Sequence, residues 1–155
     1  MAKEMTMFGR MSSRELLVGV LLLAAVSVVC LAEEIVEVNV NPHKIALNAQ
    51  GNADDVQANV NIFLPGTRVV EFDVSLSFDG TVVAQAESAF YCVIDDILII
   101  GFDRASLQAN PDVQAMANTT VKATVSGTVT DNTGATKVFT GWDMVQIVAP
   151  GKNGK

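Results

Sequence analysis

The amino-acid sequence predicts an all-β protein: an immunoglobulin-like antiparallel β-sandwich of about eight strands with one short helix, following an N-terminal signal peptide. Three observations predict it. Apolar and polar residues alternate along most of the chain, as they do in strands with one buried and one solvated face. Turn-forming residues separate these alternating segments. An uncharged apolar run precedes all of them, near the N-terminus.

The composition excludes several classes of protein. The chain has 155 residues, of which 17 are acidic and 10 basic, with two cysteines and one histidine. Half of the residues are hydrophobic, a share that disordered polyanions do not have. The net charge of −7 argues against a nucleic-acid partner, because phosphate recognition depends on clustered Lys and Arg. Two cysteines are too few for a disulfide-rich scaffold.

The apolar run extends from Leu16 to Leu31 and predicts a secretory signal peptide. A weakly basic segment precedes it, and the acidic pair Glu33-Glu34 follows it. Cleavage after Ala32 would leave small residues at the positions that signal peptidase reads. The sequence therefore predicts three parts, namely a signal peptide over 1–32, a β-sandwich domain over 33–149 and a flexible tail over 150–155.

Three other interpretations of the leader stay open. If it is not cleaved, the run would act as a membrane anchor, although it is shorter than the roughly 20 residues that span a bilayer. Cys30 would be lipidated in a lipoprotein, although Val29 stands where such signals have a small residue. Gly9 and Glu15 resemble a type IV pilin leader, but Glu15 lies six residues after the glycine, where pilins have five. A pilin would also continue as a long helix, whereas here a strand pattern follows within a few residues.

Strands are predicted wherever the alternation recurs. The turns between them are equally clear, because Asp79-Gly80 is a tight hairpin signal and Pro65-Gly66 ends the preceding strand. The segment 97–100 is apolar at every position, which predicts a central strand or one covered on both faces. The predicted strands are 36–40, 56–62, 70–78, 81–84, 97–100, 121–129, 137–139 and 143–148.

One segment breaks the strand pattern and predicts the helix. Asp103 can cap a helix that begins at Arg104, and Pro111 is expected to end it. About eight short strands with a single helix are typical of an immunoglobulin-like sandwich.

Several short motifs resemble a β-sandwich module that is common in secreted and surface proteins of archaea and bacteria. The resemblance extends over about 36–148 and implies a secreted or surface-exposed β-sandwich domain. Related modules carry an acidic, glycine-rich run that resembles a calcium loop, but here 89–96 offers only the pair Asp95-Asp96, so we expect no bound metal. The matching motifs are 38–42, 62–66, 101–104, 125–131 and 139–147.

The residues that could perform chemistry are few. His43 is the only histidine and lies in a loop without a nucleophile motif beside it. Cys92 is the only cysteine after the leader, and we interpret it as a small apolar core residue. The pairs Asp54-Asp55 and Asp95-Asp96 are interpreted as solvated turns, because glycosidase carboxylates face each other across a cleft. We therefore expect no enzyme and no cofactor.

Five residues are singled out as candidate sites. Asp143 lies on the same face of its strand as the inward residues. A buried carboxylate requires a partner, so we predict a structural ion pair with Arg104. Trp142 lies on the opposite face of the strand and should point outward. There it would bind a ligand or partner together with Tyr91, or pack under the C-terminal tail as an edge residue. Asn118 begins an Asn-Thr-Thr glycosylation sequon.

Two functions follow as hypotheses. The first is a non-catalytic structural or adhesive module, secreted or held at the cell surface, that associates with itself or with other surface proteins. Its early strand, 35–40, would supply the pairing edge. The alternative is a soluble glycan- or ligand-binding module that uses an exposed aromatic side chain. Contact with a membrane is expected only through an uncleaved leader.

Overall fold

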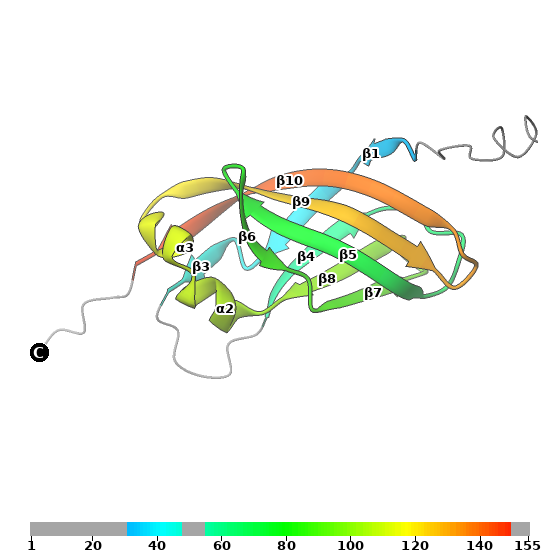
Figure 1. Ribbon diagram of the computed structural model, residues 1–155, viewed down its shortest axis with the longest axis horizontal. Coiled ribbons are helices and arrows are strands. Elements are labelled where there is room, and N and C mark those ends of the chain that lie inside the picture. The colour runs from blue at the N-terminus through cyan, green and yellow to red at the C-terminus, as the bar shows by residue number, and fades with distance from the viewer. Residues whose placement is uncertain (1–30, 48–54, 150–155) are drawn as a thin grey trace, which may run out of the picture. The chain divides into compact units, whose positions relative to one another are not determined.

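The computed structural model describes residues 31–47 and 55–149, and these form an antiparallel β-sandwich with two short helices (Figure 1). This confirms the predicted fold class. No helix in these ranges is long and apolar enough to cross a membrane. The predicted signal peptide, except for its last two residues, the predicted tail and Asp54 lie outside the described residues. The strands are β1 Glu33–Ile35, β2 Glu37–Asn41, β3 Lys44–Ala46, β4 Val56–Asn61, β5 Val69–Phe78, β6 Thr81–Gln85, β7 Ser88–Cys92, β8 Ile97–Phe102, β9 Thr120–Asp131 and β10 Thr136–Val148.

The strands form two sheets that face each other. One sheet has the order β1-β10-β9-β5-β6, with β3 also paired to β10, and the other has the order β2-β4-β8-β7. The two segments predicted at 137–139 and 143–148 are one continuous strand, β10, which pairs with β9 over its length. The predicted Asp79-Gly80 hairpin joins β5 to β6, and Asp79 takes the positive φ, 47°, that such a turn requires.

The early strand differs from its prediction because it changes sheets twice. β1 runs parallel to β10, β2 crosses to the other sheet and pairs with β4, and β3 returns to run parallel to β10. Gly141 permits the crossing, because a Cβ at this position would collide with Val38 and with the carbonyl oxygen of Val36. β2 therefore corresponds to the predicted strand 36–40, whereas β1 and β3, on either side of it, were not predicted.

The core follows the predicted alternation. Inward side chains of both sheets are fully buried, and Phe78, Phe102 and Phe139 are the largest of them. Truncating such a phenylalanine typically costs about 3–5 kcal/mol. The alternation of 70–78 puts Val70 on the same face as Val74 and Phe78, but Val70 is exposed, because the register of β5 against β9 shifts between Val69 and Glu71. A bulge of this kind turns one residue away from its expected face.

The helical segment contains two helices rather than one. Asp103 caps α2, Arg104–Ala109, as predicted, by accepting hydrogen bonds from the backbone N–H groups of Ala105 and Ser106. Pro111 does not end the helical region but begins α3, Pro111–Ala115, because a first helical position needs no N–H donor. Both helices lie at one end of the sandwich, and each buries one apolar side chain there (Figure 1).

Candidate functional site

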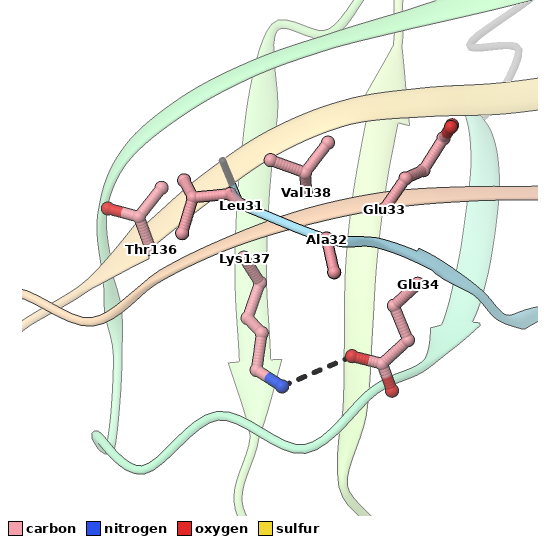
Figure 2. A pocket seen from close by; sticks show the side chains of 7 residues that line it. All are labelled: Leu31, Ala32, Glu33, Glu34, Thr136, Lys137 and Val138. Atoms are coloured by element: carbon pink, nitrogen blue, oxygen red, sulfur yellow. Dashed lines mark hydrogen bonds and ion pairs between the residues drawn. The ribbon is translucent and has the colours of Figure 1, made fainter. Parts of the chain in front are cut away.

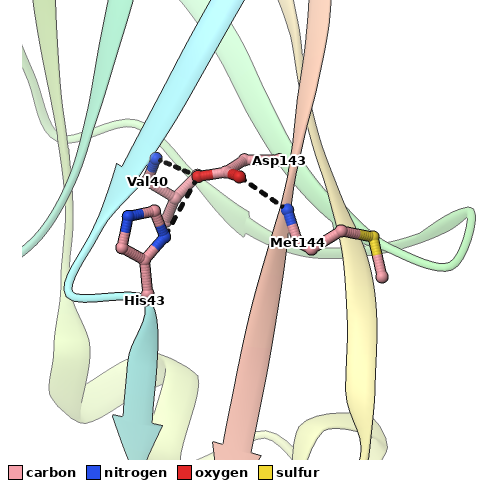
Figure 3. A network of polar contacts seen from close by, with 4 residues as sticks. All are labelled: Val40, His43, Asp143 and Met144. Carbon is pink, nitrogen blue, oxygen red and sulfur yellow. Dashed lines mark hydrogen bonds and ion pairs between the residues drawn. The ribbon is translucent and has the colours of Figure 1, made fainter.

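Asp143 is a junction between the two sheets, where β2 passes β10 (Figure 3). Its Oδ2 accepts a hydrogen bond from the backbone N–H of Val40 at 2.9 Å and lies 3.2 Å from Nδ1 of His43. The structure does not bring Arg104 and Asp143 together, which corrects the predicted ion pair. Arg104 Nε is buried without a hydrogen-bond partner among the described residues. Asp143 does need a partner, as expected, but the partner is the early strand and the loop after it.

The pair of His43 and Asp143 does not form a catalytic arrangement. A carboxylate that orients a histidine is one half of a triad, and the other half is a nucleophile within hydrogen-bond reach of the ring. In the described parts of the chain no hydroxyl or thiol group forms a hydrogen bond with His43, whose side chain is 57% exposed. The contact joins β10 to β2 and to the loop after it.

The two aromatic candidates lie on different sheets and in different environments. Trp142 faces outward on β10, as predicted, and is 54% exposed. The ammonium group of Lys122 lies 5.0 Å from the centre of its ring, at cation–π distance. Tyr91, on β7, is only 2% exposed. It therefore cannot join Trp142 in one ligand-binding surface, and Trp142 remains alone as a candidate.

Tyr91 instead connects the Asp95-Asp96 turn to the loop between β4 and β5. Its hydroxyl donates to Oδ1 of Asp96 at 2.7 Å and accepts from the backbone N–H of Leu64 at 3.1 Å. Burial is the main cause that raises the pKa of Tyr91 above its ordinary value, and the adjacent carboxylate of Asp96 adds to it. Cys92 is half-buried, and its thiol lies 3.4 Å from Oδ2 of Asp95. Within the described ranges no three metal-binding side chains gather.

Asn118 lies in the loop between α3 and β9 with a positive φ of 64°. Its backbone N–H donates to the carbonyl of Ile147, and its side-chain oxygen accepts from the N–H of Ala149. The side chain is exposed. The sequon remains a prediction.

A buried carboxylate that the sequence did not predict is found at the β9–β10 turn. Asp131 is fully buried, and its two oxygens accept hydrogen bonds from the backbone N–H groups of Gly66, Thr133 and Ala135 and from the Thr133 hydroxyl. The Thr133 hydroxyl is the main cause that lowers the pKa of Asp131, against the opposing effect of burial. In the sequence, 131–134 is a short polar run that ends in glycine, which indicates a turn but not a contact with Gly66.

The neighbouring Asn132 completes this connection. Its side-chain oxygen accepts from the backbone N–H groups of Thr67 and Arg68, at 2.8 and 3.2 Å. Gly66 fits closely against the turn, since a Cβ there would lie 2.5 Å from Asn132 Oδ1 and 2.6 Å from Asp131 Cγ. We call Asp131, Asn132 and the loop 66–68 the turn clamp. It closes the end of the sandwich opposite the helices (Figure 1).

The outer edge of β7 is an unprotected strand edge, and β6, the edge strand of the other sheet, with the sequence TVVAQ, is likewise free of charge and proline. β7 is the last strand of its sheet and pairs only with β8. Its sequence, SAFYC, has no charge, proline or glycine. Phe90 is 65% exposed, and Ile94 in the following turn is 92% exposed. Exposed strand edges usually carry charges, prolines or bulges that prevent pairing, and β7 has neither a charge nor a proline.

The described surface has a pocket beside β1 and a groove on the four-stranded sheet. A pocket of about 470 Å³ borders β1 and the start of β10, and the ion pair between Lys137 and Glu34 crosses it at 3.1 Å (Figure 2). Leu31 and Ala32 also line it, so the predicted cleavage would alter it. A groove of about 260 Å³ lies on the outer face of the four-stranded sheet. The residues that line this groove are Glu37, Asn39, Asn59, Asn61, Asp95 and Ile97.

Comparisons with known proteins found no matching protein-family model and no matching curated protein. Among solved structures, the chain is similar to a bacterial immunoglobulin-like domain from the M. primoryensis ice-binding adhesin, with 16% identity and a TM-score of 0.38 over 75% of this chain and 97% of that one. It is also similar to a structure that concerns the host cell surface retention of a 1.5-MDa bacterial ice-binding adhesin, with 15% identity and a TM-score of 0.41. This match covers 77% of the present chain, which spans only 33% of that one. Similarity at this level does not establish a common function.

Proposed function

We propose that the protein is a non-catalytic structural or adhesive module of the cell exterior, and that it associates with a second copy of itself through β7. The single observation that carries the proposal is the unprotected outer edge of this strand. The predicted leader supports an exported location. The contacts of the polar groups also favour a structural role, because Asp131 and Asp143 bind backbone groups of their own chain.

A second copy is the occupant that fits this edge best. The β7 edge and the turn after it present uncharged, apolar side chains up to Ile94, on a chain whose net charge is −7. Because β7 itself carries no charge, two copies of the strand can pair over 88–92 without facing carboxylates, and the acidic residues Glu87 and Asp95 lie only at its two ends. Antiparallel pairing of two β7 strands would satisfy backbone groups in both copies and bury Phe90 beside the new interface.

This proposal moves the pairing edge from the early strand to β7. The early strand is engaged within its own sandwich, because the N–H groups of Val36 and Val40 both donate to groups of β10. Its most exposed apolar residue, Ile35, is 84% exposed but stands between glutamates at 34 and 37. Those charges oppose close approach of another copy.

The test is the molar mass of the purified protein, measured by size-exclusion chromatography with light scattering over a range of concentrations. We expect the mass to rise with concentration, and we expect Phe90→Glu and Ile94→Glu each to weaken association at least tenfold, because they place a carboxylate at the shared edge. Ile35→Glu is the matched control and should leave association unchanged. A monomer at every concentration would refute the proposal. If only Ile35→Glu weakened association, the copies would pair through the early strand and not through β7.

A second candidate function is binding of a glycan through Trp142. The observation that favours it is the exposure of this ring on the outer face of the six-stranded sheet, beside Thr124 and, one strand further, Ser77, its register partners. We expect a glycan array to show binding that is lost in Trp142→Ala and kept in Met144→Ala, an exposed neighbour on the same face. An array without any signal would count against this function.

A further inference from the structure

The groove on the outer face of the four-stranded sheet is built from paired residues of adjacent strands. Asn39 and Asn59 are register partners on β2 and β4, and Glu37 and Asn61 form the next pair along. Ile97 on β8 follows Asn61 in the same row across the sheet. The strands therefore hold the two pairs side by side on a rigid surface rather than on a loop.

The polar groups of this groove are free to bind a ligand. Within the described chain, the amides of Asn39, Asn59 and Asn61 form no side-chain hydrogen bond, and Glu37 forms no ion pair. Asp95 contacts only the Cys92 thiol. Each amide offers both a donor and an acceptor, and each carboxylate offers acceptors only. Asparagine is depleted in strands, so three amides on one sheet face are an unusual composition.

The lining selects the chemistry of a ligand. Two carboxylates and the lack of any cation among the lining residues disfavour an anionic ligand. The lining has five polar side chains and one apolar residue. An apolar ligand is disfavoured, because it would leave the amides without hydrogen-bond partners. Vicinal hydroxyl groups fit, since each can donate to a carboxylate and accept from an amide. Ile97 and Ile99, both half-buried, supply an apolar strip beside the polar groups for the C–H face of a sugar ring.

From this arrangement we propose that the groove binds a neutral oligosaccharide, with Asn39, Asn59 and Asn61 forming hydrogen bonds to its hydroxyl groups. This site is separate from Trp142, which lies on the other sheet, and from the edge of β7. The three asparagines lie on β2 and β4, away from the proposed association surface, and only Asp95, in the turn after β7, is close to it.

The experiment is a titration of the ¹⁵N-labelled protein with neutral gluco-, xylo- and manno-oligosaccharides of four to six sugars, followed by NMR. We expect the side-chain amide signals of Asn39, Asn59 and Asn61 to shift together and to saturate with at least one sugar. In Asn59→Ala the affinity should fall about tenfold. Thr128→Ala, a half-buried strand residue on the outer face of the other sheet, should bind as the unaltered protein does. Thermal melting of each variant verifies that it is folded.

Two further titrations distinguish a neutral sugar from a cationic ligand. Glu37→Gln keeps a hydrogen-bonding group but removes its charge, so binding of a neutral sugar should change less than about twofold. A titration with spermine tests a cationic ligand. The proposal is overturned if no neutral sugar shifts the three asparagine signals, if only spermine does, or if sugars shift the indole signal of Trp142 instead.

Discussion

Replacing Gly127 with alanine is expected to destabilise the sandwich by about 3 kcal/mol or more. Gly127 lies in the middle of β9, opposite Val74 on β5 and Phe139 on β10. Its φ is 157°, and an added Cβ would collide with the backbone carbonyl oxygen of Asp73 and lie 2.6 Å from Cα of Val74. Backbone atoms in the centre of a sheet cannot move aside as a flexible side chain can. The pairing of β5 with β9 must therefore separate locally.

The matched control for this change is Gly134→Ala. Gly134, in the β9–β10 turn, also has a positive φ, 85°, but nothing lies within 4 Å of an added Cβ. Only the conformational cost of about 1–2 kcal/mol applies there. Urea unfolding of both variants measures the two costs. Equal losses of stability would show that the collision with β5 contributes nothing and that the backbone conformation alone requires glycine.

Replacing Asp131 with asparagine is expected to lower the melting temperature by about 10 °C. Every group that contacts this carboxylate is a donor, namely three backbone N–H groups and one hydroxyl. An asparagine amide would direct its own N–H₂ group at one of these donors and leave a buried donor without an acceptor. Asp73→Asn, an exposed strand position on β5, is the control and should change the melting temperature little.

The effect of Asp131→Asn should also depend on pH. The pKa of Asp131 is lowered in the folded protein, chiefly by the Thr133 hydroxyl, so its stabilising contribution is complete above the unfolded pKa of about 3.9. That contribution is lost as the pH falls through the folded pKa. We therefore expect the difference in melting temperature between the two proteins to be constant near neutral pH and to shrink below about pH 4. A difference that stays constant down to pH 2 would contradict an ionised Asp131.

The sequence predicted those features that depend on which face of a strand a residue occupies. Alternation placed Val74, Leu76 and Phe78 in the core and turned Trp142 outward, as the structure confirms. The helix cap at Asp103 was also predictable, because its partners are only two and three residues away. Local periodicity encodes such features directly.

Contacts between distant segments could not be predicted in this way. Asp143 was correctly expected to need a partner, but the choice of Val40 and His43 over Arg104 depends on the early strand crossing between sheets. The turn clamp depends on the loop at Gly66 lying against Asp131, 65 positions later in the chain. β7 was missed because SAFYC has no alternation of polar and apolar residues. In each case the decisive information is which strands are neighbours, and a single strand's pattern does not contain it.

The double crossing of the early strand has a mechanical consequence. β1 and β3 both run parallel to β10, so the described chain enters at one end of the sandwich and leaves at the other along neighbouring strands (Figure 1). A force that pulls Ala32 and Ala149 apart acts along these strands, and the hydrogen bonds between them resist it in shear. Such bonds must break together rather than one after another. Under tension between its ends, the domain is therefore held first by its backbone hydrogen bonds, before its hydrophobic core is exposed.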